Sequence, residues 1–272
     1  MTKTILITGS TDGIGKLAAF QLARGAHNLL IHGRSAEKLK QTIHQIHAVR
    51  PDLKVTAYQA DFADLHAVQK MGEEILDKEE VLDVIINNAG VYKSAEQVSK
   101  YGIDLRFTVN YLAPIVLTRI LLPMTRKSID PRIINLSSAA QVEVSMEALS
   151  GEKSLGTQAA YAQSKLALTM WSNHLSNQSD QGTVIAVNPG SLLDTRMVRE
   201  GFGRSWSSPD KGAGILAELA VEDQYQGIRG KYFDNDLGNP RGSFGAAHRD
   251  AYNADKIANL MKVTDQLLDQ LA

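Results

Sequence analysis

The sequence predicts an α/β fold in which helices cover both faces of a parallel sheet. Short apolar segments alternate along the chain with longer segments of helical pattern, as in a succession of strand–helix–strand units. The apolar segments are continuous rather than alternating, as in Ile5-Leu6-Ile7 and Val84-Ile85-Ile86. Continuous apolar strands are expected where both faces of a sheet are buried, so the two observations together favour a doubly wound parallel sheet.

Seven segments are predicted to be strands: Thr4–Thr8, Asn28–His32, Lys54–Gln59, Leu82–Asn87, Arg132–Leu136, Thr183–Asn188 and Gly230–Phe233. Helices are expected near residues 14–24, 35–49, 64–78, 99–126, 158–177 and 208–220. A chain of 272 residues fits one large α/β domain or two small ones. Because the chain contains no internal repeat, low-complexity tract or linker, we expect a single domain over residues 1–272.

Two stretches interrupt the alternation, residues 139–157 and residues 190–207. Each follows the carboxyl end of a predicted strand, where open α/β sheets bind their ligands. We therefore expect both stretches to line the substrate site. The second stretch suggests a partly hydrophobic substrate, although its apolar side chains would also suit a lid packed on the core: Leu192, Leu193, Met197, Phe202 and Trp206.

Composition excludes several classes of function. The net charge of −1 gives no electrostatic basis for binding nucleic acid or an anionic membrane, and no uninterrupted apolar run approaches the ~18 residues of a membrane span. The chain has no cysteine, which excludes disulfides, thiolate catalysis and cysteine-based zinc sites. His44 and His47 lack a third ligand at zinc-site spacing, so we expect no metal. No signal-peptide pattern precedes the first strand, and we expect a cytoplasmic protein.

The first predicted strand runs into a glycine-rich turn, Thr8–Gly15, that opens the first helix. Glycines let the backbone turn tightly and approach a pyrophosphate, whose charge meets the amide groups at the start of the helix. In this position such a turn is typical of dinucleotide binding, and the simpler alternative is a plain strand–helix connection. The cofactor-binding candidates here are Gly9, Ser10, Thr11, Gly13, Ile14 and Gly15.

The end of the second strand, His32-Gly33-Arg34, indicates which dinucleotide is bound. Sites selective for NAD usually place a carboxylate there, on the ribose hydroxyls. Gly33 offers no carboxylate to repel a 2′-phosphate, and the guanidinium of Arg34 is suited to bind one. We therefore predict NADP, with NAD as the alternative if Arg34 is only a solvated surface residue.

Two further strand ends face the same predicted cleft. Asp61, followed by Phe62, comes just after the third strand, where the carboxylate could accept a hydrogen bond from an adenine amino group. The segment Asn87–Gly90 closes the fourth strand, where amides and small residues could lie beside a ribose. An ordinary strand-end turn would use the same residue types. The cofactor-binding candidates at these two ends are Asp61, Phe62, Asn88, Ala89 and Gly90.

Tyr161 and Lys165 form a candidate acid–base pair. They are four residues apart in a segment of helical pattern, and residues at i and i+4 share one helix face. A phenol titrates near pH ~10 and handles protons poorly at neutral pH unless a nearby cation favours its anion. A lysine on the same face could supply that cation, although Tyr-x-x-x-Lys taken alone also describes an exposed helix with a surface lysine.

In order and spacing, these motifs resemble the short-chain dehydrogenase/reductase family in its single-domain form, over nearly the whole chain. The resemblance implies a Rossmann-like sheet of about seven parallel strands. It also implies hydride transfer between a nicotinamide and an alcohol or carbonyl compound. The residues that carry it are Thr8-Gly-x-x-x-Gly-x-Gly15, Asn87-Asn-Ala-Gly90, Asn110, Ser138, Tyr161-x-x-x-Lys165 and Asn188-Pro-Gly190.

The resemblance implies a role for each catalytic-type residue. Tyr161 would be the general acid/base for the substrate oxygen. Lys165 would lower the pKa of Tyr161 and hold the nicotinamide ribose. Ser138, rather than the adjacent Ser137, would hydrogen-bond the substrate oxygen and stabilise developing alkoxide charge. Asn110 would fix a water that relays protons to Lys165.

On the nicotinamide side the resemblance is less regular. Pro189 and Gly190 would let the backbone pass close to the nicotinamide, and Thr195 would reach the carboxamide, although it lies one residue further on than in many members. Ser138 and Tyr161 are separated by 22 residues, where the family commonly has far fewer. The extra residues, near 140–157, resemble the insertion of retinol-dehydrogenase-like members.

The expected function is NADPH-linked interconversion of a carbonyl compound and its alcohol, with a small molecule as partner. One alternative is a dinucleotide-binding regulatory protein, against which the four catalytic-type residues argue. Another is a nucleotide-sugar epimerase or dehydratase, for whose separate substrate domain the chain has little room. In the family, apolar faces on the fourth and fifth helices often form a homodimer or homotetramer interface, although burial against the sheet would look the same: Ile115, Leu117, Leu121, Leu166, Leu168, Met170 and Trp171.

Overall fold

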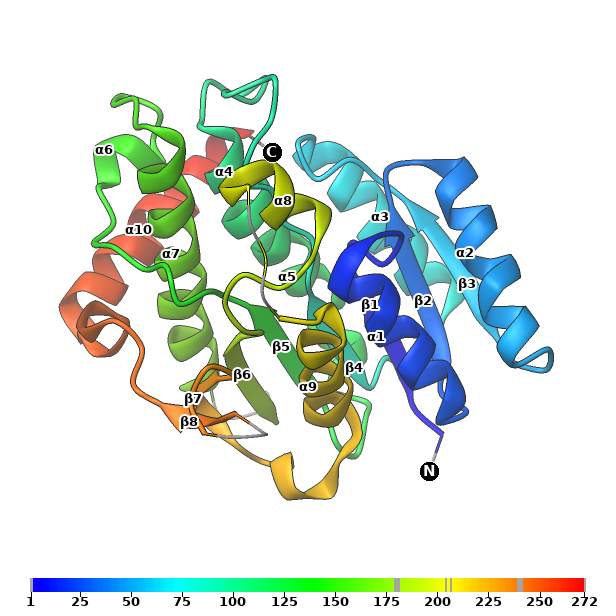
Figure 1. Ribbon diagram of the computed structural model, residues 1–272. Helices are drawn as coiled ribbons and strands as arrows, with labels where there is room; N and C mark the ends of the chain where they lie inside the picture. Colours follow the sequence, from blue (N-terminus) through cyan, green and yellow to red (C-terminus); the bar gives the residue numbers. More distant parts are fainter. Residues whose placement is uncertain (1, 179–181, 204, 206, 239–241, 272) are drawn as a thin grey trace.

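The computed structural model describes residues 2–178, 182–203, 205, 207–238 and 242–271. Within these residues, eight strands form one sheet in the order β3-β2-β1-β4-β5-β6-β7-β8, as Figure 1 shows. The first seven are parallel and β8 runs antiparallel to β7. The strands are β1 Thr4–Ile7, β2 Asn28–Gly33, β3 Val55–Gln59, β4 Val84–Asn87, β5 Arg132–Leu136, β6 Thr183–Asn188, β7 Arg229–Asp234 and β8 Ser243–Gly245.

The predicted fold class is confirmed, including all seven parallel strands. β8 was not predicted because a three-residue antiparallel strand carries no apolar run for a sequence pattern to detect. The strand order reverses between the neighbours β1 and β4, because the chain continues from β1 to β2 on one side and from β4 to β5 on the other. This is the topological switch point, where doubly wound sheets bind ligands.

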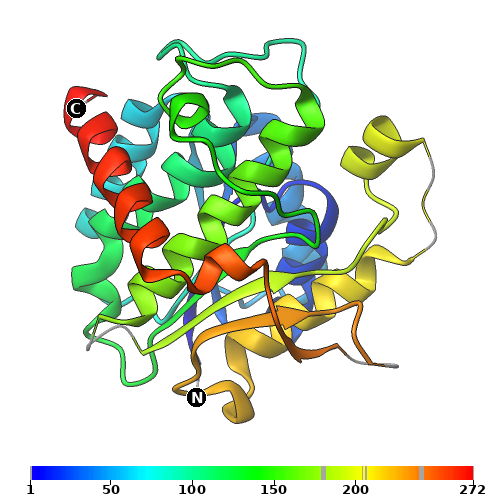
Figure 2. The same ribbon diagram turned by 90° about the vertical axis from the view of Figure 1, so that its left-hand side faces the viewer.

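Helices connect the strands and lie on both faces of the sheet (Figures 1 and 2). Their bounds are α1 Gly13–Arg24, α2 Ala36–Val49, α3 Leu65–Lys78, α4 Leu105–Phe107, α5 Ala113–Thr125, α6 Met146–Leu149, α7 Thr157–Ser176, α8 Arg196–Phe202, α9 Pro209–Val221 and α10 Ala254–Leu271. A π-helical turn, η1 Thr108–Leu112, joins α4 to α5, and the 3-10 turns are η2 Asp223–Tyr225 and η3 Arg249–Tyr252.

The helix predicted over residues 99–126 begins later than expected. Gly102 has a φ of +75°, a conformation that ends regular structure, and Val98 pairs with Asp104 in an isolated β-bridge. Asp104 then caps the helix by accepting a hydrogen bond from the Arg106 amide. The short helices α6 and α8 lie inside the two stretches that interrupt the predicted alternation, where capping by Ser145 and Thr195 starts each one.

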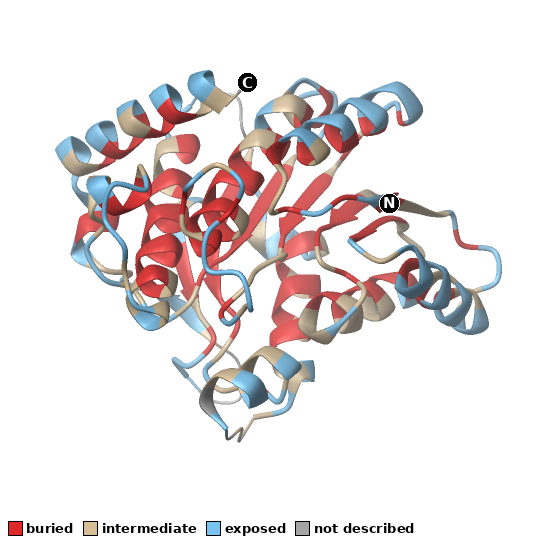
Figure 3. Ribbon diagram, turned by 90° about the horizontal axis from the view of Figure 1, so that it is seen from above, coloured by how far each residue is buried: buried red, intermediate tan, exposed pale blue. Residues whose placement is uncertain are grey.

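Alternate residues of each strand enter two separate cores. One core packs the sheet against α3, α5, α7 and α10 through residues such as Leu6 and Ile85. The other packs it against α1, α2 and α9 through their neighbours Ile5 and Ile86. This arrangement explains the continuous apolar strands, because every side chain along them is covered. Figure 3 shows the buried strands enclosed by helices whose outer faces are exposed.

The apolar faces of the fourth and fifth predicted helices, α5 and α7 in the structure, are used inside this chain. All seven residues considered for an oligomer interface belong to the first core, which also contains Ile257, Leu260, Met261 and Leu267 of α10. Tyr111 and Thr264 join η1 to α10 through a hydroxyl–hydroxyl hydrogen bond of 2.7 Å. The pattern thus reflects burial within the chain.

The helical segment Leu105–Thr125 is long and apolar enough to cross a membrane by length and composition, with a mean hydropathy of 1.4 in its most apolar window. In this structure 67% of that window is buried. The segment therefore has the burial of a core helix, and Arg106, Asn110 and Arg119 interrupt its apolar run.

The packing of α10 predicts a large loss of stability on truncating its buried face. Leu260 is fully buried, and replacing such a leucine by alanine costs about 2–5 kcal/mol. Leu260→Ala should lower the free energy of unfolding by that amount in urea denaturation, whereas the exposed Lys262→Ala should change it by less than about 0.5 kcal/mol. Equal stabilities of the two variants would show that α10 is not part of the core.

Candidate active site

The predicted site residues converge at the carboxyl ends of β1, β4, β5 and β6. Gly90, in the turn after β4, shows how close they lie. A methyl group added to Gly90 would be 3.3 Å from Asn110 Oδ1 and 3.6 Å from Lys165 Nζ. Residues from η1 and α7, which are far apart in sequence, therefore meet at one strand end beside the topological switch point.

The glycine-rich turn is held in shape by Asn88. Its Nδ2 donates to the carbonyls of Thr8 at 2.8 Å and Gly9 at 3.1 Å, and its backbone amide donates to the Thr8 hydroxyl at 3.0 Å. A side chain on Gly15 would approach Asn88 Nδ2 to 2.3 Å and the Gly9 carbonyl to 2.5 Å. Gly9 also has a φ of +66°. Glycine is thus required at both positions by geometry and by close approach.

His32 joins the same turn to two neighbouring strands. Its Nδ1 accepts a hydrogen bond from the Gly9 amide at 3.1 Å, so Nε2 carries the proton and donates to the Ala60 carbonyl at 3.1 Å. The ring stacks on Phe62 with a centroid separation of 4.3 Å. Burial lowers the pKa of His32 to about 4, against smaller opposing effects of the Ala60 carbonyl and Asp61. His32 is therefore a neutral clamp between the ends of β1, β2 and β3.

At the end of β2, Thr11 fills the space beside Gly33, and the next residue, Arg34, carries an exposed positive charge. A side chain on Gly33 would approach Thr11 to 2.7 Å, so Thr11 occupies the space that a carboxylate there would need. Arg34 is exposed, and among the described residues its guanidinium has no ion-pair partner. Lys38, in the first turn of α2, lies 4.0 Å from the Asp12 carboxylate. Asp12 caps α1 through the Gly13 amide at 2.8 Å.

The two candidates after β3 differ in what they can offer a nucleotide. Asp61 is exposed, and its Oδ1 accepts the Ala63 amide at 3.0 Å in a local turn. Phe62 is buried against His32 with 4% of its surface exposed. The side chain of Phe62 therefore belongs to the core, and only its backbone can contact a ligand.

Tyr161 lies on α7 at the centre of the candidate catalytic group. The Ser138 hydroxyl lies close enough to its phenol to influence the phenol's pKa, and its ring meets Tyr92 edge-on at a centroid distance of 5.0 Å. Burial raises the pKa of Tyr161 and the nearby Tyr92 adds to this, while the Ser138 hydroxyl lowers it. Ser137 is directed elsewhere, donating to the Lys165 carbonyl at 3.2 Å. The structure thus places the second of the two serines beside Tyr161.

Lys165 is buried beside Tyr161, with 4% of its surface exposed. Its Nζ lies 5.7 Å from the centre of the Tyr161 ring and donates to the Leu136 carbonyl at 2.6 Å. Burial lowers the pKa of Lys165 to about 8. Lys165 is not among the influences on the pKa of Tyr161 in this structure, so its predicted effect on the phenol stays a prediction. The ammonium points to a carbonyl of β5, and burial is the largest influence on the phenol.

Asn110 lies in the π-helical turn η1, a distortion often found at functional sites. Its Oδ1 accepts the Val91 amide at 2.7 Å, and its Nδ2 donates to the Val91 carbonyl and to Ser164, each at 3.0 Å. Ser164 in turn donates to the Tyr161 carbonyl at 2.7 Å. The side chain of Asn110 therefore ties the turn after β4 to α7, which is a structural connection that the sequence did not predict.

The Pro189-Gly190 turn is fixed by two aspartates at the end of β7. Gly190 has a φ of +118°. Asp236 accepts hydrogen bonds from the Ser191 amide at 2.9 Å, the Ser191 hydroxyl at 2.6 Å and Asn188 Nδ2 at 2.9 Å. Asn188 Nδ2 also donates to Asp234 at 2.8 Å. This carboxylate support was missed, since Asp236 is far from the turn in sequence.

Thr195 begins α8 and lies over the glycine-rich turn. Its hydroxyl accepts the Val198 amide at 3.3 Å, and a methyl group on Gly13 would lie 3.7 Å from Thr195 Cγ2. Arg196, the next residue, lies 3.6 Å from the Asp12 carboxylate. Residues 190–196 therefore cross from the Pro189-Gly190 turn to the start of α1.

The other end of α8 packs against Tyr92, the ring that meets Tyr161. A side chain on Gly201 would approach the Tyr92 ring to 2.8 Å, and Lys93 donates to the Glu200 carbonyl at 2.9 Å. Some apolar residues of the stretch 190–207 are predicted to line the substrate site. Among them Leu193 is buried, while Leu192 and Met197 are partly exposed. Phe202 ends α8, and Trp206 lies outside the described residues.

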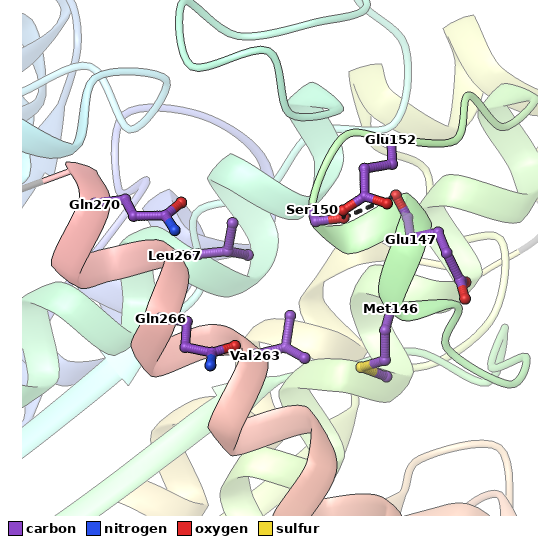
Figure 4. Close-up of a pocket in the computed structure, with 8 residues that line it drawn as sticks. All are labelled: Met146, Glu147, Ser150, Glu152, Val263, Gln266, Leu267 and Gln270. Atoms are coloured by element: carbon purple, nitrogen blue, oxygen red, sulfur yellow. Dashed lines mark hydrogen bonds between the residues drawn. The ribbon is translucent and has the colours of Figure 1, made fainter.

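A shallow groove of about 270 Å³ lies between α6 and α10 (Figure 4). Met146 and Glu147 line one side, and Val263 and Leu267 line the other. Ser150 and Glu152 close one end through a hydrogen bond of 3.0 Å. None of the candidate catalytic or cofactor-binding residues lines the groove, so it is separate from the Tyr161 site. Residues within 146–152, which belong to a stretch predicted to line the substrate site, line this groove instead.

Comparison with known proteins agrees with the geometry. The family model described as short chain dehydrogenase matches residues 3–204. The chain is 33% identical over 251 residues to retinol dehydrogenase 13 of Mus musculus, covering 85% of this chain and 75% of that protein. The fold resembles an uncharacterized protein from Mycobacterium paratuberculosis with a TM-score of 0.79 and 23% identity, over 97% and 92% of the two chains.

A second solved structure, a short chain dehydrogenase from Escherichia coli CFT073 complexed with NADPH, matches with a TM-score of 0.70 and 25% identity. The match covers 85% of this chain and 95% of that one. The chain described here therefore belongs to the short chain dehydrogenase family, whose members are NAD(P)-dependent oxidoreductases. The resemblance inferred from the motifs, including that to retinol dehydrogenases, is confirmed.

The buried, neutral His32 predicts a component of acid sensitivity. Unfolded histidine binds a proton below its ordinary pKa of 6.5, but folded His32 does so only below about 4. The unfolded state therefore binds more protons between these values, and stability falls as pH falls. At about pH 5 this contribution amounts to about 2 kcal/mol relative to neutral pH.

Urea denaturation at neutral pH and at about pH 5 would test this. The loss of unfolding free energy between the two should be smaller by about 2 kcal/mol in His32→Asn, which has no titratable group. His66→Asn, at an exposed position on α3, should keep the wild-type dependence. If His32→Asn and wild type lose the same unfolding free energy between the two pH values, the result would contradict a buried, neutral His32.

Proposed function

We propose that this protein is an NADPH-linked oxidoreductase that interconverts a carbonyl compound and its alcohol, with Tyr161 as general acid/base. The observation that carries the proposal is the position of the Tyr161 phenol near the Ser138 hydroxyl and the buried Lys165, beside the topological switch point. Both hydroxyls can bind one substrate oxygen, which is the atom that changes protonation when a carbonyl becomes an alcohol.

The residues fit a dinucleotide along the strand ends. The glycines at positions 9 and 15 let the backbone of this turn pack closely against Asn88 and Ala89, and the amides of α1 are oriented toward an anion. Gly190 offers a similar backbone approach next to the Pro189 ring. When bound, the nicotinamide would accept or supply the hydride. The turn, Lys165 and Thr195 would hold the cofactor by its phosphates and ribose.

The protein residues would manage the proton and the oxygen. During reduction, Tyr161 would donate its proton to the substrate oxygen as the carbon receives hydride, and Ser138 would donate a hydrogen bond to the same oxygen. This bond strengthens as negative charge develops there, so it favours the transition state. Lys165, whose pKa of about 8 keeps it mostly protonated at neutral pH, would stabilise the resulting phenolate through its positive charge.

The preference for NADPH is supported by the charges near β2. Arg34 is exposed and, within the described part of the chain, carries no ion pair. Lys38 lies in the first turn of α2 and adds a second cation. Gly33 has no side chain, and Thr11 fills the space beside it. This position therefore has no carboxylate that would repel a 2′-phosphate. The match to an E. coli structure that contains NADPH is consistent with this preference.

Replacing the proposed acid/base should separate chemistry from binding. Tyr161→Phe removes only the hydroxyl, so turnover of a carbonyl substrate with NADPH should fall by about 10²–10⁴-fold while NADPH affinity stays near wild type. Tyr58→Phe is the matched control, since the Tyr58 hydroxyl is also buried but contacts Glu79, away from the site. Near-wild-type turnover in Tyr161→Phe would refute the assignment.

The substrate panel for this assay should contain benzaldehyde, cyclohexanone, phenanthrenequinone and retinal, with NADPH oxidation as the readout. Retinal is included because retinol dehydrogenase 13 is among the relatives. Tight NADPH binding without turnover of any member would favour a regulatory dinucleotide-binding protein over an oxidoreductase.

The cofactor preference has its own test. Arg34→Ala should weaken NADPH binding by about 10–100-fold, because hydrogen bonds to charged groups contribute about 1.5–3 kcal/mol, and should leave NADH binding nearly unchanged. Lys40→Ala, an exposed cation on α2, is the control for bulk charge. Titration of both cofactors by fluorescence would measure the ratio, and an equal loss for NADPH and NADH would contradict the role of Arg34.

A further inference from the structure

The carbonyl of Ser138 is held by two donors that lie outside the catalytic motifs. The Tyr232 hydroxyl of β7 donates to it at 3.0 Å, and Gln141 Nε2 donates to it at 2.9 Å. Tyr232 is buried, with 4% of its surface exposed. Gln141 also lowers the pKa of Tyr232, against the larger effect of burial. Two side chains from distant parts of the chain therefore converge on the backbone carbonyl of the residue that lies near Tyr161.

The two donors hold Ser138 at the point where the chain leaves the sheet. The preceding residue, Ser137, is fixed to the sheet through its amide, which donates to the Val187 carbonyl at 2.8 Å. After Ser137 the chain leaves β5 without regular structure until α6. The Ser138 hydroxyl accepts the Ala140 amide at 3.1 Å. The carbonyl bonds to Tyr232 and Gln141 are thus the next contacts that fix the direction of the Ser138 side chain.

Gln141 is itself oriented by the C-terminal part of the chain. Its Oε1 accepts the backbone amide of His248 at 3.0 Å. The segment around His248 is itself held by polar contacts. Lys256 bridges Asp250 at 2.8 Å and also bonds Glu143, and Asn173 of α7 donates to the carbonyl of the residue after Asp250. The amide of His248 therefore has a fixed place relative to the stretch 139–157.

We propose that Gln141 and Tyr232 are positioning residues that fix Ser138 against Tyr161, and that residues 246–253 orient Gln141 through the His248 amide. The inference rests on the proposed function, in which Ser138 binds the substrate oxygen. Tyr232 and His248 lie beyond residues 3–204, which the family model matches. The C-terminal part of this chain is then part of the catalytic arrangement and not only a cover on the core.

Two variants remove the direct support. Tyr232→Phe deletes only the hydroxyl, and Gln141→Ala deletes the amide. Each should lower kcat by about tenfold, since misplacing a positioned group by a fraction of an ångström has effects of this order, with NADPH affinity unchanged. Because both donors serve one carbonyl, the double variant should lose less activity than the product of the single losses. Tyr58→Phe should keep wild-type kcat.

A pair of variants at His248 isolates the C-terminal link. Its φ is −53°, which proline can adopt, so His248→Pro removes the amide hydrogen that Gln141 accepts. The same change removes the ring, whose Nδ1 accepts the Asp250 amide. His248→Ala removes the ring but keeps the amide hydrogen. The inference predicts that kcat falls in His248→Pro as in Gln141→Ala and stays near wild type in His248→Ala.

Two readouts distinguish positioning from a loss of stability. The Ser138 hydroxyl lowers the pKa of Tyr161, so loosening Ser138 should move the limb of the kcat–pH profile that belongs to Tyr161 to higher pH. NMR of tyrosine labelled at Cζ gives a readout without turnover. The Tyr161 resonance, assigned with Tyr161→Phe, should shift in Gln141→Ala and Tyr232→Phe but not in Tyr58→Phe.

The outcomes separate this inference from the proposed function. Absence of wild-type turnover on the whole substrate panel would contradict the proposed function, while a shifted Tyr161 resonance would still support the positioning of Ser138. Wild-type turnover combined with an unchanged resonance and an unchanged pH profile in Gln141→Ala and Tyr232→Phe would overturn the inference. Equal effects of His248→Pro and His248→Ala would overturn the C-terminal link.

Discussion

The site depends on the hydrogen bonds by which Thr8 and Asn88 join the ends of β1 and β4. At the topological switch point, β1 leads to a helix on one face of the sheet and β4 leads to helices on the other face. Beyond the strands, other hydrogen bonds must therefore join the two segments. The Thr8 hydroxyl accepts the amides of Asn88 and Ala89, and the Asn88 side chain donates to two carbonyls of the glycine-rich turn. These bonds fix the turn against β4, and with it the start of α1.

The catalytic group carries opposing electrostatic effects that a bound substrate and cofactor would have to balance. Burial raises the pKa of Tyr161 and lowers that of Lys165, so in both cases the protein interior favours the neutral form. The Ser138 hydroxyl has a local effect that favours the phenolate. In the proposed function the position of Ser138 therefore affects the pKa of Tyr161 as well as the binding of the substrate oxygen, and the two donors on its carbonyl are proposed to fix that position.

Several of the supports come from distant parts of the chain. Gln141 meets His248 across 107 residues and Ser138 meets Tyr232 across 94, and Asp236 holds the turn after β6 across 45. Each joins the strand ends of the matched family region to β7 or to a segment on its C-terminal side. The C-terminal part thus contributes to the core through α10 and to the site through the segments around Asp236 and His248.

Much of this protein could be predicted from its sequence, because the signals are local. The strands are visible as apolar runs, Tyr161 and Lys165 share a helix face by their spacing, and the glycines of the first turn come directly after a strand. The sequence could not indicate the contacts whose partners are far apart. No local sequence pattern indicates the hydrogen bonds of the neutral His32, or those of the Asn88 side-chain amide to the glycine-rich turn. The pKa of Tyr161 is the clearest case, because its direction depends on burial and on where the Lys165 ammonium points. The sequence by itself determined the fold class and the candidate residues for the chemistry. The tertiary structure decided how they are held and charged, since that depends on the path of the chain between them.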